Sequence, residues 1–246
     1  MLETLPPDSR FAVIGASGSI GQAMLTVLRE HFPQAQLIAL SRQPIPAASL
    51  PQDTRWVPID LSTEESVATA AQEVTGDGPL RGVFITTGLL HDGPDFQPEK
   101  SIRHLTRENL ERSFLINAIG PALVGRYFLP LLPKREASYF AALSARVGSI
   151  SDNRVGGWYG YRASKAALNM FLKNFAIEMK RSHPHLIIAG LQPGTVDSAL
   201  SKPFQGSARE ILDPIVSAQG MLRALNTMTP EASGSLIDWK GLSFAP

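Results

Sequence analysis

Tyr161 and Lys165 are the residues whose types and spacing could most directly do chemistry in this sequence. They lie four positions apart in an amphipathic stretch over 157–181, so on a helix both side chains leave from one face. A phenol has an ordinary pKa of about 10, and a neighbouring ammonium stabilises the phenolate. The pair therefore predicts a tyrosine that exchanges a proton near neutral pH. The plainer alternative is a tyrosine and a lysine that merely cover a helix surface.

A glycine-rich turn precedes a helical pattern near the start of the chain, in the run Gly15-Ala16-Ser17-Gly18-Ser19-Ile20-Gly21. It follows a short apolar run and opens a helix predicted over 18–31. Backbone N–H groups in such a turn approach a phosphate closely, and the helix start adds about half a positive charge. The alternative is a purely structural turn. The run predicts a pyrophosphate site formed by Gly15, Ser17, Gly18, Ser19, Ile20 and Gly21.

The next strand ends in Ser41-Arg42 and has no acidic residue there. An acid at that point would hold the ribose 2′-hydroxyl of NAD, whereas a guanidinium forms a charge-assisted fork to a 2′-phosphate. The sequence therefore predicts NADP, with NADPH preferred over NADH, unless Arg42 is an ordinary solvated arginine. Asp60, which closes the third strand, is placed to accept from the adenine amino group. It could equally cap the helix that follows.

The elements that must position these residues alternate along the whole chain. Short apolar runs and longer amphipathic stretches predict an α/β fold, a doubly wound parallel sheet with helices on both faces. Strands are predicted at 11–15, 36–40, 55–59, 81–86, 138–143, 186–191 and 235–238. Helices are predicted at 18–31, 63–75, 104–131, 157–181 and 207–226. Nothing repeats and no low-complexity linker occurs, so one domain over 1–246 is expected, with a small substrate lid near 198–215.

Composition excludes several other classes of protein. The 246 residues are 43% hydrophobic and 18% charged with a net charge of +1, which predicts a buried core and no field for nucleic acid. Without cysteine there is no disulfide or thiolate chemistry, and the five histidines have no ligand spacing, so no metal is expected. The first ten residues lack the pattern of a secretion signal. We expect a cytoplasmic protein with no membrane segment.

Taken together, these motifs resemble the short-chain dehydrogenase/reductase family, and within it the C-factor-like branch. The resemblance rests on the glycine-rich turn, Asp60, Asn117, the Tyr161–Lys165 pair and the run Pro193-Gly194-Thr195-Val196-Asp197-Ser198. It implies that Tyr161 is the acid/base, that Lys165 holds the nicotinamide ribose and lowers the tyrosine pKa, and that Asn117 positions a water in a proton relay. Further cofactor contacts that it implies are Leu61, Thr87, Gly88, Pro193, Gly194, Val196 and Ser198.

The sequence departs from the family pattern at three places. Ser19 replaces a glycine of the phosphate loop, and Ile85-Thr86-Thr87-Gly88 replaces the usual NNAG. Ala145 occupies the position of the usual catalytic serine, which donates a hydrogen bond to the substrate oxygen. We predict that the adjacent Ser144 takes this role, although it would have to turn toward the site. Ser149 and Ser151 are the alternatives on the same loop.

The function predicted from these residues is an NADPH-dependent oxidoreductase that transfers a hydride between nicotinamide and a carbonyl or alcohol. The alternative is a nucleotide-binding signalling or interaction protein of the C-factor type with little catalysis. The predicted helix over 157–181 is apolar on more than one side, which requires two buried surfaces. A homodimer or homotetramer packed through this helix and the one over 104–131 is therefore expected.

Overall fold

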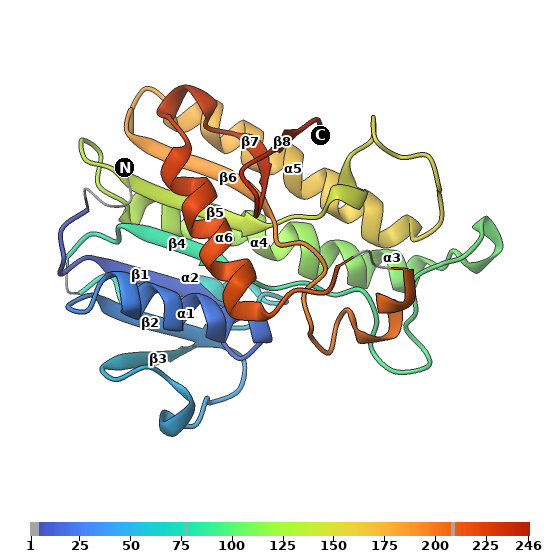
Figure 1. Cartoon of the computed structure of the whole chain (residues 1–246), viewed down its shortest axis with the longest axis horizontal. Coiled ribbons are helices and arrows are strands. Elements are labelled where there is room, and N and C mark those ends of the chain that lie inside the picture. Colours follow the sequence, from blue (N-terminus) through green and yellow to red (C-terminus); the bar gives the residue numbers. More distant parts are fainter. Residues whose placement is uncertain (1–4, 77, 208–209) are drawn as a thin grey trace.

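The strands assemble into one sheet, shown in Figure 1. The computed structural model describes residues 5–76, 78–207 and 210–246. Within these residues eight strands have the order β3-β2-β1-β4-β5-β6-β7-β8. They are β1 (Arg10–Ile14), β2 (Gln36–Ser41), β3 (Thr54–Pro58), β4 (Gly82–Ile85), β5 (Ser138–Leu143), β6 (Leu186–Gln192), β7 (Ser235–Asp238) and β8 (Ser243–Phe244). All neighbouring pairs are parallel except β7 and β8.

Helices cover both faces of the sheet, as the sequence predicts. Their bounds are α1 (Ser19–His31), α2 (Glu64–Val74), α3 (Arg107–Phe114), α4 (Gly120–Phe128), α5 (Tyr159–Met179) and α6 (Pro214–Thr227). Helices α1 and α6 pack together on one face, while α4 packs against both α2 and α5 on the other (Figure 1). This arrangement confirms the doubly wound α/β fold.

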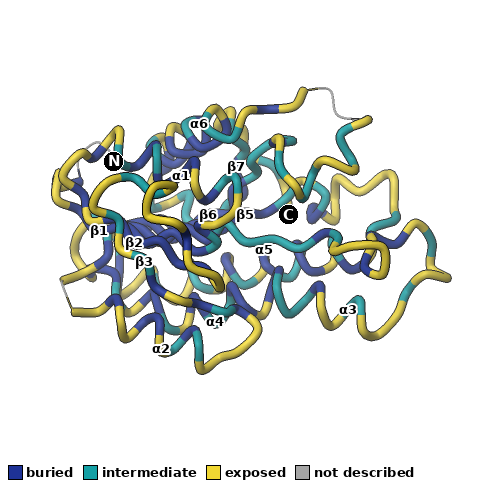
Figure 2. The backbone as a smooth tube through the Cα atoms, turned by 90° about the horizontal axis from the view of Figure 1, so that it is seen from below, coloured by how far each residue is buried: buried dark blue, intermediate teal, exposed yellow. Residues whose placement is uncertain are grey.

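The apolar runs bury both faces of each central strand. In β1, Phe11 and Val13 join the core under α1 and α6, whereas Ala12 and Ile14 join the core under α2, α4 and α5. Successive side chains of a strand point to opposite faces, so a strand covered on both sides must be apolar throughout. Figure 2 shows the strands as a buried centre with exposed loops around it.

Two predicted helices differ clearly from the observed ones, and one observed strand was not predicted. The helix over 104–131 is broken by a π turn at Leu115–Ile119, because Pro121 has no N–H to donate to the carbonyl of Asn117. The helix predicted over 207–226 begins only at Pro214, where Asp213 caps it by accepting from the N–H of Ile215 at 2.7 Å. Strand β8 was not predicted, since two residues give no periodic signal.

By length and composition alone, the helical stretch Arg107–Leu131 could cross a membrane. In this fold its segments contact α2 and α5 instead. Core helices of soluble proteins pass the same test, so the expected absence of a membrane segment stays a prediction.

Candidate active site

A cleft of about 570 Å³ opens at the carboxyl ends of the central strands. This is the edge where open parallel sheets bind their ligands. Many of the residues predicted to hold a cofactor line it, and Arg112 is a lining residue that the sequence did not single out. The lining residues predicted from the sequence are Gly15, Ser17, Gly18, Ser41, Arg42, Asp60, Leu61, Thr87 and Gly88.

The glycine-rich turn has the close-packed geometry of a phosphate loop. Gly15 has a φ of +86°, which favours glycine. A Cβ on Gly21 would lie 2.3 Å from the carbonyl oxygen of Gly15, so only glycine lets α1 start this close to the turn. Gly18 occupies the position before α1 without a side-chain cap, which leaves the first-turn N–H groups for an anion. Ser19 and Ile20 form the first turn of α1.

Ser41 and Arg42, which were predicted to act together, have different environments at the end of β2. The Ser41 hydroxyl is buried, accepts from Trp56 Nε1 at 3.0 Å and donates to the carbonyl of Gln43 at 2.7 Å. It is therefore committed to the fold, while Arg42 is exposed at the cleft. A guanidinium there can reach a phosphate without breaking a structural contact.

Asp60 lies at the cleft, and its carboxylate already has partners. Its Oδ1 accepts from the N–H of Ser62 at 2.9 Å and from the Ser62 hydroxyl at 2.7 Å. Partial burial raises the pKa of Asp60, but these hydrogen bonds and the charge of Arg42 outweigh it and hold the pKa below its usual value. The N-cap position of α2 is Thr63, so the helix-cap alternative for Asp60 is wrong.

The replacement of NNAG leaves an unpaired polar group at the cleft. The Thr87 hydroxyl is buried and has no hydrogen-bond partner within the described chain. A buried hydroxyl of this kind costs free energy until a ligand or water satisfies it. Together with the glycine-rich turn, it means that the residues present fit a dinucleotide of the NAD(P) type.

Asn117 is buried in the π turn and holds Leu89, which lies in the segment after β4. Its Oδ1 accepts from the N–H of Leu89 at 2.8 Å, and its Nδ2 donates to the Leu89 carbonyl at 2.8 Å. The same amide donates to the Ser164 hydroxyl at 3.2 Å, and that hydroxyl donates to the carbonyl of Tyr161 at 2.9 Å. Asn117 thereby connects the cleft with the helix that carries Tyr161.

Lys165 of the predicted acid/base pair lies beside Gly88, in the same segment after β4. A Cβ on Gly88 would be 3.9 Å from Lys165 Nζ and 4.0 Å from Asn117 Oδ1. Lys165 Nζ lies 5.8 Å from the centroid of the Tyr161 ring and donates to the carbonyl of Leu143 at 2.7 Å. The fold therefore brings Tyr161, Lys165 and Asn117 together at one end of the cleft.

The pKa of Tyr161 is shifted in the direction opposite to the predicted one. Burial raises the pKa of Tyr161 to about 12 and lowers the pKa of Lys165 to about 8. In the protein without bound groups, loss of hydration thus outweighs the attraction between phenolate and ammonium that the spacing implied. A bound ligand or an ordered water would have to supply the stabilisation of a phenolate.

None of the three candidate serines presents a free hydroxyl. Ser144 is 3% exposed and its Oγ donates to Asn169 Oδ1 at 2.5 Å, a contact with the middle of α5. The Ser149 hydroxyl accepts from the N–H of Asp152 at 3.2 Å, and Ser151 donates to the carbonyl of Pro246 at 3.3 Å. These contacts do not support the predicted role of Ser144, because its hydroxyl is already engaged away from Tyr161.

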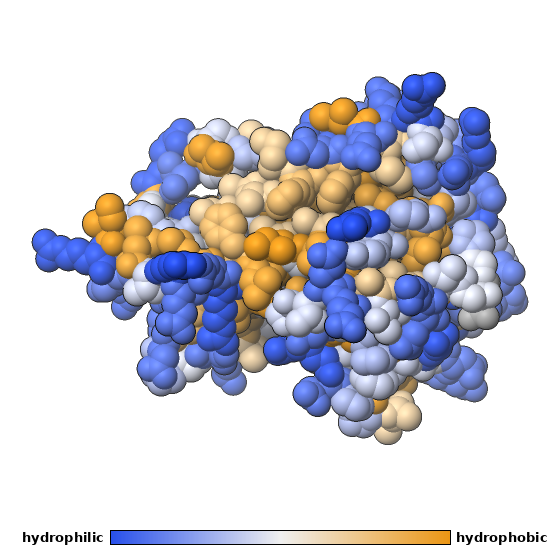
Figure 3. Space-filling view, turned by 180° about the vertical axis from the view of Figure 1, so that it is seen from behind, coloured by the Kyte–Doolittle hydropathy of each residue, from blue (hydrophilic) through white to orange (hydrophobic). Residues whose placement is uncertain are grey.

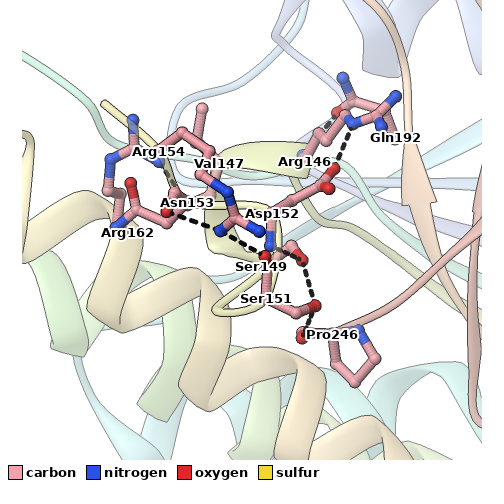
Figure 4. A network of polar contacts seen from close by, with 10 residues as sticks. All are labelled: Arg146, Val147, Ser149, Ser151, Asp152, Asn153, Arg154, Arg162, Gln192 and Pro246. Atoms are coloured by element: carbon pink, nitrogen blue, oxygen red, sulfur yellow. Dashed lines mark hydrogen bonds and ion pairs between the residues drawn. The ribbon is translucent and has the colours of Figure 1, made fainter. Parts of the chain in front are cut away.

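Ser149 and Ser151 belong to a polar network that shapes the loop after β5, shown in Figure 4. Arg146 Nε donates to Asp152 at 2.7 Å, and the Arg146 N–H donates to Gln192 Oε1 at 3.3 Å. Arg162 of α5 donates to the carbonyls of Val147 at 3.1 Å and Gly157 at 3.0 Å. The network holds the loop against α5 and β6.

The segment after β6 forms the far side of the site. Ser217 donates to the carbonyl of Pro193 at 2.7 Å, and Gly194 has a φ of +80°. Val196 is buried and bridges to Leu212, while Ser198 donates to the Ser201 hydroxyl at 3.2 Å. These predicted cofactor contacts lie outside the lining of the cleft described above.

An aromatic cluster not predicted from the sequence connects the predicted lid to Tyr161. Phe204, in the turn Lys202–Ser207, has its ring centroid 5.2 Å from that of Trp158 and 5.5 Å from that of His91. The rings of Trp158 and Tyr161 are 6.3 Å apart. His91 Nε2 also lies 3.2 Å from the carbonyl of Ala199. Residues 208–209 of the predicted lid lie outside the described residues.

Chemically, the site combines an anion-binding turn, an exposed guanidinium and a tyrosine–lysine pair at the end of one cleft. Across the described ranges, no three acidic or histidine side chains gather as metal ligands would. The arrangement fits a dinucleotide that lies along the strand ends with its reactive part beside Tyr161.

The chain resembles known proteins in sequence and in fold. The chain is 31% identical over 177 residues to 1-hydroxy-2-glutathionyl-2-methyl-3-butene dehydrogenase of Rhodococcus sp. (strain AD45), covering 72% of this chain and 73% of that protein. It is 34% identical to the C-signal of Myxococcus xanthus, covering 54% and 76%, which confirms the predicted likeness to C-factor. The NADPH-bound carbonyl reductase from chicken fatty liver has the same fold, with a TM-score of 0.82, 21% identity and coverage of 96% and 94%.

A model of the family described as short chain dehydrogenase matches residues 10–208. This match spans the phosphate loop, Asn117 and the Tyr161–Lys165 pair. The chain therefore belongs to the short-chain dehydrogenase/reductase family, whose members are NAD(P)-dependent oxidoreductases.

Proposed function

We propose that this protein is an NADPH-dependent carbonyl reductase with Tyr161 as its acid/base. One observation carries the proposal: Lys165 and Asn117 lie next to Gly88, which lines the cleft that begins at the phosphate loop, and Tyr161 lies beside Lys165. A dinucleotide along this cleft has its reactive end beside Tyr161, a side chain that can donate a proton there. The carbonyl reductase from chicken liver is a relative in fold with the same cofactor.

When bound, NADPH supplies a hydride to a carbonyl carbon. Tyr161 donates its phenolic proton to the carbonyl oxygen, and its raised pKa keeps that proton in place at neutral pH. Lys165 has two tasks, since its ammonium holds the Leu143 carbonyl and lies over the Tyr161 ring, where it favours the phenolate formed after transfer. In the reverse direction Tyr161 accepts the proton of an alcohol.

The remaining predicted contacts take defined places in this proposal. Arg42 binds the 2′-phosphate, and the N–H groups of the first turn of α1 bind the pyrophosphate. Asn117 fixes the strand end at Leu89 and orders a water for proton relay. The segment from Pro193 to Ser198 faces the nicotinamide carboxamide, and Phe204, in the described part of the predicted lid, packs against Trp158.

The test is a panel of aldehydes, ketones and quinones incubated with NADPH or NADH, with nicotinamide absorbance followed over time. Turnover with NADPH and at least one carbonyl, and slower turnover with NADH, is the expected result. A protein that binds NADPH and turns over none of the panel would favour the nucleotide-binding signalling alternative, which the likeness to C-signal motivates.

We further propose that the protein is a cytoplasmic homodimer or homotetramer that packs through α4 and α5. Met170 and Ile177 on α5 are 62% and 64% exposed. Figure 3 shows apolar side chains gathered over the middle of the face opposite α1 and α6. Burying such a face on a second copy removes apolar area from water. Light scattering should give a multiple of the 26.6 kDa chain mass, and a monomeric mass would contradict this assembly.

A further inference from the structure

Glu99 is a buried carboxylate that the reaction described above does not use. It is 4% exposed. None of the ion pairs found among the described residues includes it. A charged group taken out of water is stable only where hydrogen bonds replace its hydration. The position of Glu99 therefore needs a structural reason.

That reason is the start of α5. Glu99 Oε2 accepts from the N–H of Gly160 at 3.1 Å, and the Glu99 carbonyl accepts from the N–H of Trp158 at 2.6 Å. Trp158 stands at the N-cap position with a φ of 49° and ψ of 44°, and it makes no side-chain cap hydrogen bond. Glu99 thus supplies, from a distant segment, the acceptor that an N-cap residue ordinarily provides. Its negative charge also lies at the positive end of a 21-residue helix.

Gly160 gives this carboxylate its room. A Cβ at position 160 would lie 3.0 Å from Glu99 Oε1 and 2.9 Å from the Ser113 hydroxyl of α3. Because Gly160 directly precedes Tyr161, the hydrogen bond between the Glu99 carboxylate and the Gly160 N–H constrains the same helical turn as the proposed acid.

The segment that carries Glu99 is itself anchored to α3. Asp92 pairs with Arg112, and the Arg112 guanidinium lies 4.7 Å from the centroid of the Phe96 ring. Asp92 and Phe96 form an isolated antiparallel bridge. The segment just before Glu99 is therefore held by α3, while the Glu99 carboxylate binds α5.

We propose that Glu99 is a positioning residue for Tyr161. By capping the first turn of α5 and holding Trp158 in its left-handed conformation, it fixes the direction in which the phenol reaches the substrate. A bulky residue with positive φ is retained only where its surroundings enforce it, and the Glu99 carbonyl is the group that binds the Trp158 N–H. The inference rests on the proposed function, but the capping itself does not.

The first measurement needs no substrate. Hydrogen exchange in the cofactor-free protein should show faster exchange of the Gly160 amide, whose acceptor is the Glu99 carboxylate, in Glu99→Ala than in wild type. Glu99→Gln keeps an oxygen acceptor for the Gly160 N–H and should retain most of the protection. Unchanged exchange in Glu99→Ala would overturn the capping and with it the inference.

The second measurement separates positioning from general stability. In single turnovers with saturating NADPH, Glu99→Ala should transfer hydride about tenfold or more slowly, because small displacements of a catalytic group are costly, while NADPH affinity stays within about twofold. Glu99→Gln should recover most of the rate. Thr106→Ala is the matched control, since it removes the cap hydrogen bond to the Asn109 N–H of α3 and should lower only the melting temperature.

A wild-type rate in folded Glu99→Ala would overturn the positioning role. So would an equal loss in Thr106→Ala. If the wild-type protein turns over no carbonyl at all, the proposed function fails instead, and the exchange measurement still decides whether Glu99 caps α5.

Discussion

The side-chain amide of Asn117 pairs with the backbone of Leu89 as a neighbouring strand would, through two hydrogen bonds of 2.8 Å each. Asn117→Asp keeps the acceptor but removes the donor, so it leaves the partly buried Leu89 carbonyl unpaired beside a carboxylate. The free energy of unfolding should fall by about 1–3 kcal/mol. NADPH affinity should fall too, because Leu89 lines the cleft.

Chemical denaturation and fluorescence titration with NADPH measure these effects. Asn174→Asp, on the exposed side of α5, is the matched control and should change neither. A fully stable Asn117→Asp would show that the pairing contributes nothing.

Tyr161→Phe removes the proposed acid and leaves the ring in place. Turnover should drop by about 10²- to 10⁴-fold, the usual contribution of a positioned proton donor. NADPH binding should stay close to wild type, since the cleft lining does not include Tyr161. Tyr159→Phe, two residues earlier and 37% exposed, is the control expected to keep full turnover. Equal rates in Tyr161→Phe and wild type would contradict the mechanism.

Arg42→Ala tests the choice between NADP and NAD. The guanidinium is exposed at the cleft and is the proposed partner of the 2′-phosphate. Its loss should weaken NADPH binding by about 2 kcal/mol, the range of a charge-assisted hydrogen bond, and leave NADH binding unchanged. Dissociation constants for both cofactors measure this. Arg55→Ala, whose side chain faces Glu73 at 3.9 Å, is the control. A preference for NADPH that survives in Arg42→Ala would disprove the assignment.

Substitutions at the adjacent positions Ala145 and Ser144 test whether a serine hydroxyl contributes to catalysis. Ala145→Ser installs it at the family position and should raise turnover, because a donor to the substrate oxygen stabilises developing charge. Ser144→Ala should lower stability through its lost bond to Asn169 and leave the rate per folded enzyme almost unchanged. Ser149→Ala and Ser151→Ala complete the comparison. A large rate loss confined to Ser144→Ala would instead establish the role predicted from the sequence.

Lys165 gives stability a pH dependence in the cofactor-free protein. Burial lowers its pKa from 10.5 to about 8, so between these values the unfolded chain binds more protons than the folded one. Stability must then rise with pH over this window, with a slope that approaches about 1.4 kcal/mol per pH unit. Urea denaturation from pH 8 to 9.5, about where tyrosines begin to ionise, should show the rise.

Lys165→Met should abolish that rise and be more stable than wild type at pH 7, because no buried ammonium remains. Lys173→Met, on an exposed position of the same helix, should keep the wild-type slope. An equally steep slope in Lys165→Met would show that another group is responsible.

Local features of the sequence determined the fold class and identified many of the residues that line the cleft. Apolar runs buried on both faces, as in β1, predict a parallel sheet directly, because a strand covered on both sides has no polar face. The phosphate loop could be predicted because Gly15 to Gly21 interact within one turn. The Tyr161–Lys165 pair follows from helical spacing alone.

Only the tertiary structure decided what depends on contacts between distant segments. Glu99 binds the N–H of Gly160, 61 positions away, and Asn117 binds Leu89 from a π turn that no periodicity announces. The direction of Ser144 was decided by Asn169, 25 positions away. The pKa of Tyr161 was decided by burial, which spacing does not reveal. Spacing fixes which side chains share a face, whereas hydration and hydrogen-bond partners depend on everything packed around them.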